Sequence, residues 1–237
     1  MTTRPCLPPS TGKNPKRYGL AFEHLNLRRN PFEELSPDTR AQLAIVDIEP
    51  YLDFLKQKRA ALVFIGHCGR GKTTHLLALK RQFPEAPYVY FPEDGPRPRI
   101  PKAPRLFVDE TQRMSWWQRI RLFSGSSTLI LGTHRNEDTA LERAKRPVLR
   151  VEIKTLSLEK LRQIVLSRLE WSRRSSGPIP TLADFELESL LQHFRDNIRA
   201  LEYSLYEVFQ RLQENGPVSL DPSTFPSLES FEEVAHD

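Results

Sequence analysis

The chain has 237 residues, with 35 Lys and Arg against 30 Asp and Glu, and two cysteines. That length suits one sizeable domain with a small companion and buries enough surface to fold without disulfide or metal staples. Two cysteines exclude a disulfide-rich scaffold, and no apolar run reaches the ~20 residues that a membrane span needs. We therefore expect no membrane insertion and a cytoplasmic location.

The two ends of the chain differ in charge. Residues 1–19 combine prolines with basic side chains and few apolar ones, which predicts a disordered basic arm. Residues 217–237 are rich in acidic side chains and predict a disordered acidic tail. Residues 1–29 carry a charge of +5 and residues 216–237 a charge of −5, so they cancel. The net charge of +5 therefore belongs to the body of the chain, where Lys and Arg concentrate in residues 94–150.

Short apolar runs and the amphipathic stretches between them predict alternating strands and helices. The expected strands are 62–65, 88–91, 106–108, 128–131 and 149–153, and the helices between them are 73–83, 111–123 and 138–145. Mostly apolar strands that alternate with helices predict an α/β fold with a parallel sheet covered on both faces. We assign residues 20–154 to this domain.

Residues 92–105 are an exception, because their prolines cannot continue a helix. They predict a stiff, extended loop that carries Arg97, Arg99 and Lys102. Two interpretations stay open: an arm that contacts nucleic-acid phosphates, or a shortened linker with solvated charges.

All elements expected after residue 153 are helical. They are 158–171, a helix capped by Thr181, and a helix that starts at Asp196 and runs to about residue 214. Residues 155–216 therefore form a small all-α lid domain, hinged near Thr155.

Residues 66–73 read Gly-His-Cys-Gly-Arg-Gly-Lys-Thr, which fits the P-loop pattern G-x-x-x-x-G-K-[ST] between a predicted strand and helix. Glycines let the backbone wrap a pyrophosphate, whose charge meets unpaired amides at the helix start. Lys72 would neutralise the β- and γ-phosphates, and Thr73 would ligate Mg²⁺. The predicted nucleotide-binding residues are Gly66, His67, Cys68, Gly69, Arg70, Gly71, Lys72, Thr73 and Thr74.

An acidic pair, Asp109 and Glu110, ends the third predicted strand. Asp109 is expected to bind nucleotide-linked Mg²⁺ together with Thr73, and Glu110 to orient and deprotonate the attacking water. A glutamate at this place favours hydrolysis over group transfer. The alternative is a pair of solvated acids at a helix start, where the helix dipole favours them.

These motifs, in this order, resemble the AAA+ ATPases over roughly residues 20–215. The resemblance implies a five-stranded parallel sheet with helices on both faces, followed by a helical lid, and the use of ATP with Mg²⁺. It also implies that Thr133 is the sensor-1 residue, with His134 as the alternative, and that Arg199 is the sensor-2 arginine. Arg199 is otherwise a surface arginine paired with Asp196 or Glu202.

The AAA+ resemblance further implies a homo-oligomer in which an arginine finger completes a neighbour's site. The candidates precede the fifth strand: Arg146 first, then Arg143, with a solvated basic helix end as the alternative. Trp116 and Trp117 at helical spacing predict packing on the sheet, with a base-stacking face as the alternative.

Residues 25–32, Leu-Asn-Leu-Arg-Arg-Asn-Pro-Phe, followed by Ser-Pro-Asp, resemble the ExeA-like and transposition-ATPase (TniB/TnsC-like) branch, related to origin-recognition ATPases. This resemblance implies a DNA-associated helper ATPase with duplex DNA as a partner. A protein-directed ATPase for secretion or surface-structure assembly, and a nucleotide-gated module with little turnover, remain alternatives.

Overall fold

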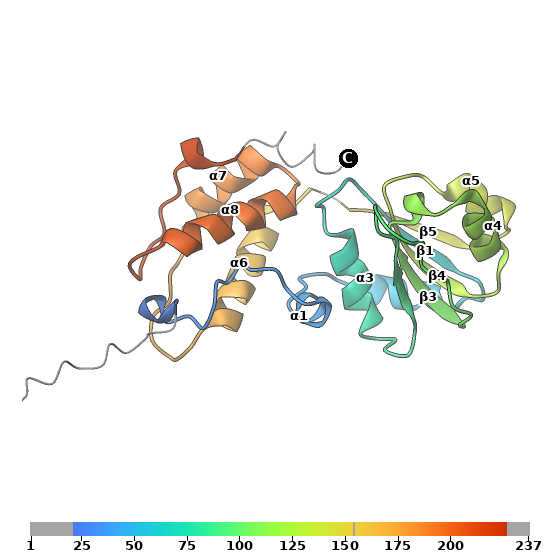
Figure 1. Ribbon diagram of the computed structural model, residues 1–237, viewed down its shortest axis with the longest axis horizontal. Coiled ribbons are helices and arrows are strands. Elements are labelled where there is room, and N and C mark those ends of the chain that lie inside the picture. Colours follow the sequence, from blue (N-terminus) through green and yellow to red (C-terminus); the bar gives the residue numbers. More distant parts are fainter. Residues whose placement is uncertain (1–20, 154, 227–237) are drawn as a thin grey trace, which may run out of the picture.

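A computed structural model describes residues 21–153 and 155–226 of the protein, shown in Figure 1. Its centre is a sheet of five parallel strands in the order β2-β3-β4-β1-β5. The strands are β1 (Ala61–Ile65), β2 (Tyr88–Tyr90), β3 (Arg105–Asp109), β4 (Thr128–Thr133) and β5 (Val148–Glu152). The predicted α/β fold class with a parallel sheet is confirmed.

Helices cover both faces of this sheet. Successive side chains of each strand point to opposite faces and therefore pack under different helices. On β1, Ala61 and Val63 join the core under α4 (Trp116–Ser124) and α5 (Asp138–Arg143). Leu62 and Phe64 join the opposite core under α3 (Lys72–Lys80). Short helices α1 (Pro37–Gln42), α2 (Glu49–Leu52) and η2 (Phe54–Lys56) precede β1.

The predicted helix over 111–123 is interrupted in the structure. A single 3-10 turn, η3 (Thr111–Arg113), comes first, and α4 then begins after Ser115. The Ser115 hydroxyl accepts a hydrogen bond from Gln118 N, and the Gln118 side chain accepts one from Ser115 N. This capping box fixes where α4 begins. In this register Phe123 is buried, but Trp116 and Trp117 are exposed, so the expectation that they pack on the sheet is wrong.

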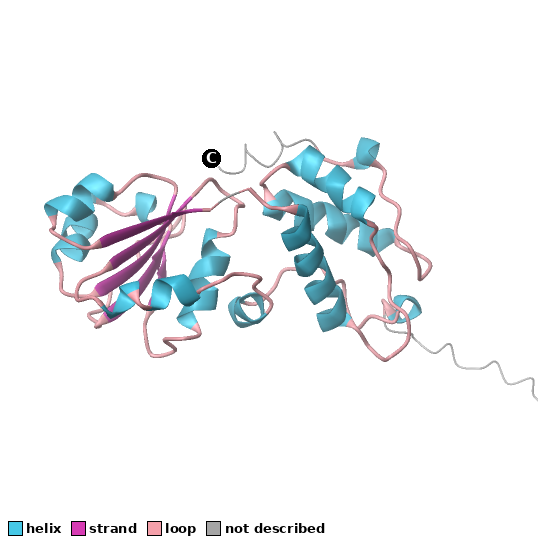
Figure 2. Ribbon diagram, turned by 180° about the vertical axis from the view of Figure 1, so that it is seen from behind, coloured by secondary structure: helices cyan, strands magenta, loops and turns pink. Residues whose placement is uncertain are grey.

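A second unit of helices lies beside the sheet, as Figures 1 and 2 show. It contains α6 (Leu158–Ser172), α7 (Asp184–Phe194) and α8 (Ile198–Arg211), with a hydrophobic core of its own. Residues at both ends of the described chain pack into this core. At the start these are Leu25, which ends η1 (Glu23–Leu25), and the later residues Leu27 and Phe32. At the end they are Val218, Leu220 and Phe225, which lie on either side of η4 (Pro222–Thr224).

The unit borders therefore differ from those expected. Residues 21–32 belong with the lid rather than with the sheet, because Leu27 pairs with Arg173 as a β-bridge after α6. Residues 217–226 are packed rather than tail-like, because their apolar side chains complete the lid core. The predicted basic arm 1–19 and residues 227–237 lie outside the described residues.

Two expected helix caps are also corrected. Ala183, not Thr181, precedes α7, and Thr181 instead forms backbone bonds with Gly216 and Val218. Asn197, not Asp196, caps α8, because its side-chain Oδ1 accepts a hydrogen bond from Ala200 N at 3.1 Å. Asp196 is thereby left to interact outside its own helix.

Arg146, the first candidate for an arginine finger, is buried at the turn before β5. Its guanidinium donates hydrogen bonds of 2.6–3.3 Å to the backbone carbonyls of Arg59, Leu122, Phe123, Gly125 and Ser127. Burial lowers its pKa to about 10. Because an arginine finger must extend into a neighbouring subunit, this placement corrects our expectation for Arg146. Arg143, which is exposed, is the candidate that remains.

We expect Arg146→Ala to destabilise the fold, because it leaves buried carbonyls at the end of α4 without a donor. The free energy of unfolding should fall by about 3 kcal/mol, which lowers the melting temperature by roughly 6–12 °C. Thermal denaturation followed by circular dichroism measures this. Arg143→Ala is the matched control and should change stability by less than about 0.5 kcal/mol. Equal losses in both variants would contradict this assignment.

Candidate functional site

The P-loop follows β1 at the carboxyl edge of the sheet, where parallel α/β sheets bind their ligands. Gly69 and Gly71 adopt φ values of 77° and 93°, a left-handed conformation that glycine adopts without strain. α3 begins directly at Lys72, so its unpaired backbone amides face the loop. Strand, loop and helix are thus arranged as phosphate binding requires.

Lys72 is buried beneath this loop. Its Nζ donates hydrogen bonds to the carbonyls of Gly66 and His67, at 3.0 and 2.9 Å. Burial lowers the pKa of Lys72, and the charges of Glu110 and Asp109 oppose that shift. The ammonium group therefore lies inside the curve of the loop, where a bound phosphate would offer it a charged acceptor.

Asp109 ends β3 next to the loop and is completely buried. Its Oδ2 accepts hydrogen bonds from Thr73 Oγ1 at 2.7 Å and Tyr88 OH at 2.8 Å, and its Oδ1 accepts one from Glu110 N at 3.0 Å. Burial raises the pKa of Asp109, although these hydrogen bonds oppose the shift. Gly132 on neighbouring β4 gives Asp109 its space, because a Cβ there would overlap Oδ1.

Thr73 and Asp109, the expected magnesium ligands, are therefore in direct contact. Mg²⁺ prefers hard oxygen ligands and uses one or two protein groups together with substrate phosphates. A hydroxyl and a carboxylate side by side beneath a phosphate loop fit that donor set. Tyr88 is a contact that the sequence did not reveal, because an aromatic residue in a strand normally indicates packing.

Glu110 comes next in the chain with φ of 59°, in the left-handed region. Gln112 Nε2 donates to its Oε2 at 2.5 Å, and His134 Nε2 and Arg113 Nε lie 3.5 and 3.7 Å from the same oxygen. Burial raises the pKa of Glu110, but His134, Lys72 and Arg113 outweigh it and lower the pKa to about 2. Glu110 is therefore ionised at neutral pH.

Of the two sensor-1 alternatives, His134 is the side chain that contacts Glu110. Thr133 is buried, and its hydroxyl both donates to Arg135 O and accepts from Arg135 N in its own turn. His134 N is also bonded to Gln112 Oε1 at 3.3 Å, so Gln112 joins the end of β4 to Glu110. The sequence did not indicate a role for Gln112 and Arg113, because one turn of polar residues after a strand has no distinctive pattern.

The start of α8 in the lid lies directly on the P-loop. Ile198 N donates to Gly69 O at 3.1 Å, and Arg70 forms an ion pair with Asp196. Arg199, the expected sensor-2 arginine, is exposed and places Nη1 3.6 Å from Cys68 Sγ. The alternative pairing of Arg199 with Asp196 or Glu202 is not observed, since those acids bind Arg70 and Arg168.

A cavity of about 430 Å³ lies between the P-loop and the lid. Its size falls within the usual range for small-molecule sites. Beyond the P-loop and Glu110, its apolar walls come from three separate parts of the chain, which include Ile45, Val46, Tyr51, Ile153 and Ile164. The cavity thus joins the P-loop to apolar side chains, and charged side chains that include Arg40, Glu152 and Lys160 line it as well.

No family model matches the sequence, and no curated protein matches it. The fold is similar to the crystal structure of Cdc6p from Pyrobaculum aerophilum, with a TM-score of 0.45 and 14% sequence identity. The match covers 78% of this chain and 62% of that one, so the chain spans less than two thirds of the length of this neighbour. Within residues 21–153 and 155–226, no helix is both long and apolar enough to cross a membrane.

Asp109→Asn should stabilise the folded protein near neutral pH. Burial raises the folded-state pKa of Asp109, so its folding contribution is most favourable below the unfolded pKa and is lost as pH rises through the folded pKa. The asparagine side chain at this position stays uncharged at every pH, so the variant does not lose this contribution to stability as the pH rises. Urea denaturation should show a gain at pH 7 that shrinks toward acidic pH.

Asp94→Asn, at an exposed position, is the control and should leave stability nearly unchanged at both pH values. A destabilised Asp109→Asn at pH 7 would show that the hydrogen bonds to the ionised carboxylate outweigh the cost of burying its charge.

Proposed function

We propose that the protein is an AAA+-type ATPase that binds ATP with Mg²⁺ in the cavity between sheet and lid and hydrolyses it. The observation that carries this proposal is the convergence of Lys72, the contacting pair Thr73 and Asp109, and ionised Glu110 at one edge of the sheet. Two chain segments, the start of α3 and the end of β3, supply these groups, which argues against a chance match to the P-loop pattern.

The triphosphate would occupy the P-loop, where the amides at the start of α3 point toward it. Lys72 would exchange its bonds to Gly66 O and His67 O for phosphate oxygens. Thr73 and Asp109 would hold Mg²⁺, which, when bound, neutralises charge on the β- and γ-phosphates. The choice of adenine over guanine rests on the AAA+ resemblance, since the sequence contains no guanine-reading Asn-Lys-x-Asp segment.

Glu110 would orient the water that attacks the γ-phosphorus, as the bond to the β–γ bridging oxygen breaks and ADP and phosphate form. Its carboxylate accepts a hydrogen bond from that water and is the nearby group that can take up its proton. His134 and Gln112 position the carboxylate, since both contact Oε2. A pKa of about 2 makes Glu110 a weak base, so its main contribution is orientation.

The lid would change its contacts with the P-loop when a nucleotide binds there. Ile198 bonds to Gly69, Asp196 pairs with Arg70, and Arg199 lies beside Cys68. A phosphate in the loop draws the Arg199 guanidinium inward as the sensor-2 group. Binding or loss of the γ-phosphate therefore changes the contacts that hold the lid on the sheet.

We further propose that this ATPase is a DNA-associated helper of the transposition or replication kind, which assembles as a homo-oligomer when ATP is bound. Support comes from the excess of Lys and Arg in residues 94–150 and from the sequence resemblance of residues 25–32. Arg143, the exposed last residue of α5, is our candidate for the arginine finger between subunits.

Glu110→Gln should lower the ATP hydrolysis rate by roughly 100-fold or more, because the amide lacks the negative charge and the second acceptor oxygen with which the carboxylate orients the water. Its affinity for ATP, measured by calorimetry, should change little, since Glu110 does not belong to the phosphate loop. Glu188→Gln, an exposed lid position, is the matched control and should hydrolyse ATP at the wild-type rate. An unchanged rate in Glu110→Gln would favour a nucleotide-gated module or another base.

Duplex DNA should stimulate ATP hydrolysis, and its binding should weaken with salt. Each neutralised phosphate contributes about −0.9 to the slope of log K against log salt. A non-hydrolysable ATP analogue should drive assembly on DNA, visible by sedimentation. A flat salt plot without stimulation would reject the DNA-associated function, leave the ATPase proposal standing, and favour a protein-directed partner.

A further inference from the structure

A second, larger groove of about 1540 Å³ opens at the edge of the sheet opposite the nucleotide site. Arg105 and Thr128, the first residues of β3 and β4, line it, whereas the P-loop follows the last residue of β1. Its walls come from residues 55–59, residues 97–106 and the α4 side that includes Gln118 and Arg121. The groove therefore has no part in the proposed nucleotide site.

The charge of this groove is of one sign. No Asp or Glu lines it, and its basic lining residues are Lys56, Lys58, Arg59, Arg97, Arg99, Lys102, Arg105 and Arg121. A cleft lined by one sign of charge concentrates ligands of the opposite sign. An extended polyanion is the ligand that such a lining matches.

Half of these basic groups are already engaged elsewhere. Lys56 pairs with Asp53, and Arg105 lies near Glu85. Arg59 and Arg97 donate hydrogen bonds to backbone carbonyls. The remaining four are exposed and have neither an ion pair nor a side-chain hydrogen bond within the described parts of the chain: Lys58, Arg99, Lys102 and Arg121. These four are available to phosphates.

The proline-rich loop that supplies Arg99 and Lys102 is fastened at both ends. Near its start, Arg97 donates to Arg113 O, and Gln118 Nε2 donates to Pro98 O at 3.4 Å. At its end, Ser127 Oγ donates to Ala103 O at 2.6 Å, and Thr128 N donates to Pro104 O at 2.8 Å. Its prolines restrict the backbone further, so the loop loses little conformational entropy when a ligand binds.

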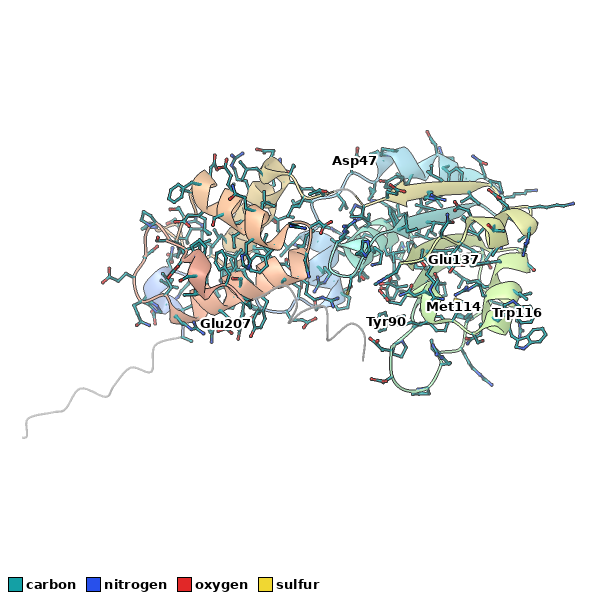
Figure 3. All side chains as sticks on the ribbon, turned by 90° about the horizontal axis from the view of Figure 1, so that it is seen from above. Asp47, Tyr90, Met114, Trp116, Glu137 and Glu207 are labelled. Atoms are coloured by element: carbon teal, nitrogen blue, oxygen red, sulfur yellow. The ribbon has the colours of Figure 1, made fainter. Side chains whose placement is uncertain are left out.

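Two exposed tryptophans lie beside the groove on α4. Trp117 is 73% exposed and Trp116 is 63% exposed, and their ring centroids are 4.4 Å apart. Trp117 precedes Arg121 by four residues, so the two side chains are neighbours on the helix surface. Figure 3 shows Trp116 projecting outward at the end of the sheet domain farthest from the lid. Exposed aromatic faces beside cations are a platform on which nucleic-acid bases stack.

We propose that this groove binds a single-stranded segment of nucleic acid, with phosphates on Lys58, Arg99, Lys102 and Arg121 and a base stacked on Trp117. A duplex keeps its base faces inside and cannot use the tryptophan, whereas a single strand presents both backbone and bases. The inference deepens the proposed association with DNA and rests on it, but not on ATP hydrolysis.

The test measures fluorescence anisotropy of labelled 20-nucleotide probes with the full chain at several salt concentrations. The probes are oligo-dT, oligo-rU and a 20-base-pair duplex, so that DNA, RNA and duplex binding are compared. Arg99→Ala/Lys102→Ala should weaken oligo-dT binding at least tenfold and reduce the salt slope by about 1.4, at 0.7 per phosphate. Arg195→Ala/Arg211→Ala removes the same charge from exposed lid positions and should stay within twofold of wild type.

A stacking role is tested separately at Trp117. Trp117→Ala should weaken oligo-dT binding by roughly 5- to 150-fold, which corresponds to 1–3 kcal/mol per stacked base, with little change in salt slope. Trp117→Phe retains a stacking ring and should recover most of the affinity. Basal ATP hydrolysis should be unchanged in all groove variants, which shows that they are folded.

The inference is overturned if the groove pair binds oligo-dT as tightly as its lid control, or if Trp117→Ala binds as wild type does. It is also overturned if the groove variants lose only duplex binding, or if Trp117→Ala changes self-association alone, since a second copy then covers the tryptophans. Wild-type protein that binds duplex but not oligo-dT would remove this inference and leave the DNA association intact. Binding to none of the probes would remove both.

Discussion

The buried carboxylate of Asp109 is the interaction on which the rest of the site depends. It joins the end of β3 to the start of α3 through Thr73 and to β2 through Tyr88. A charged group in such a place is tolerated only when its oxygens are hydrogen-bonded, and three donors satisfy them here. The same contacts set Thr73 beside Asp109, and the bond from Glu110 N to Asp109 Oδ1 ties the start of the next turn to this carboxylate. Asp109 therefore organises both halves of the proposed catalytic centre.

The lid completes this centre from a distance in sequence. Its own core buries the chain on either side of the sheet domain, so the lid forms a separate packed unit. The Asp196–Arg70 ion pair and the bond from Ile198 N to Gly69 O connect that unit to the phosphate loop. Because these contacts are few, they are easily exchanged for contacts to a ligand. This is the physical basis on which the proposed nucleotide binding can change the relation between the two units.

The parallel sheet separates two kinds of chemistry. All strands run in one direction, so the P-loop and the acids gather at the carboxyl edge, and the basic groove opens at the amino edge. The proline-rich segment 92–104 makes this possible, because it returns from β2 to β3 as an extended loop and not as a helix. Basic side chains that a crossover helix would spread around its surface are aligned along one groove instead.

The sequence by itself determined the strands, most helices and the residues of the phosphate loop, because apolar periodicity and glycine spacing are local properties of a chain. It also placed Asp109 and Glu110 correctly at the end of a strand. Only the tertiary structure decided that His134 contacts Glu110, that Arg146 is buried among carbonyls, and that the tryptophans of α4 face solvent. These depend on helix register and on contacts between residues far apart in the chain, for which side-chain type gives no local signal.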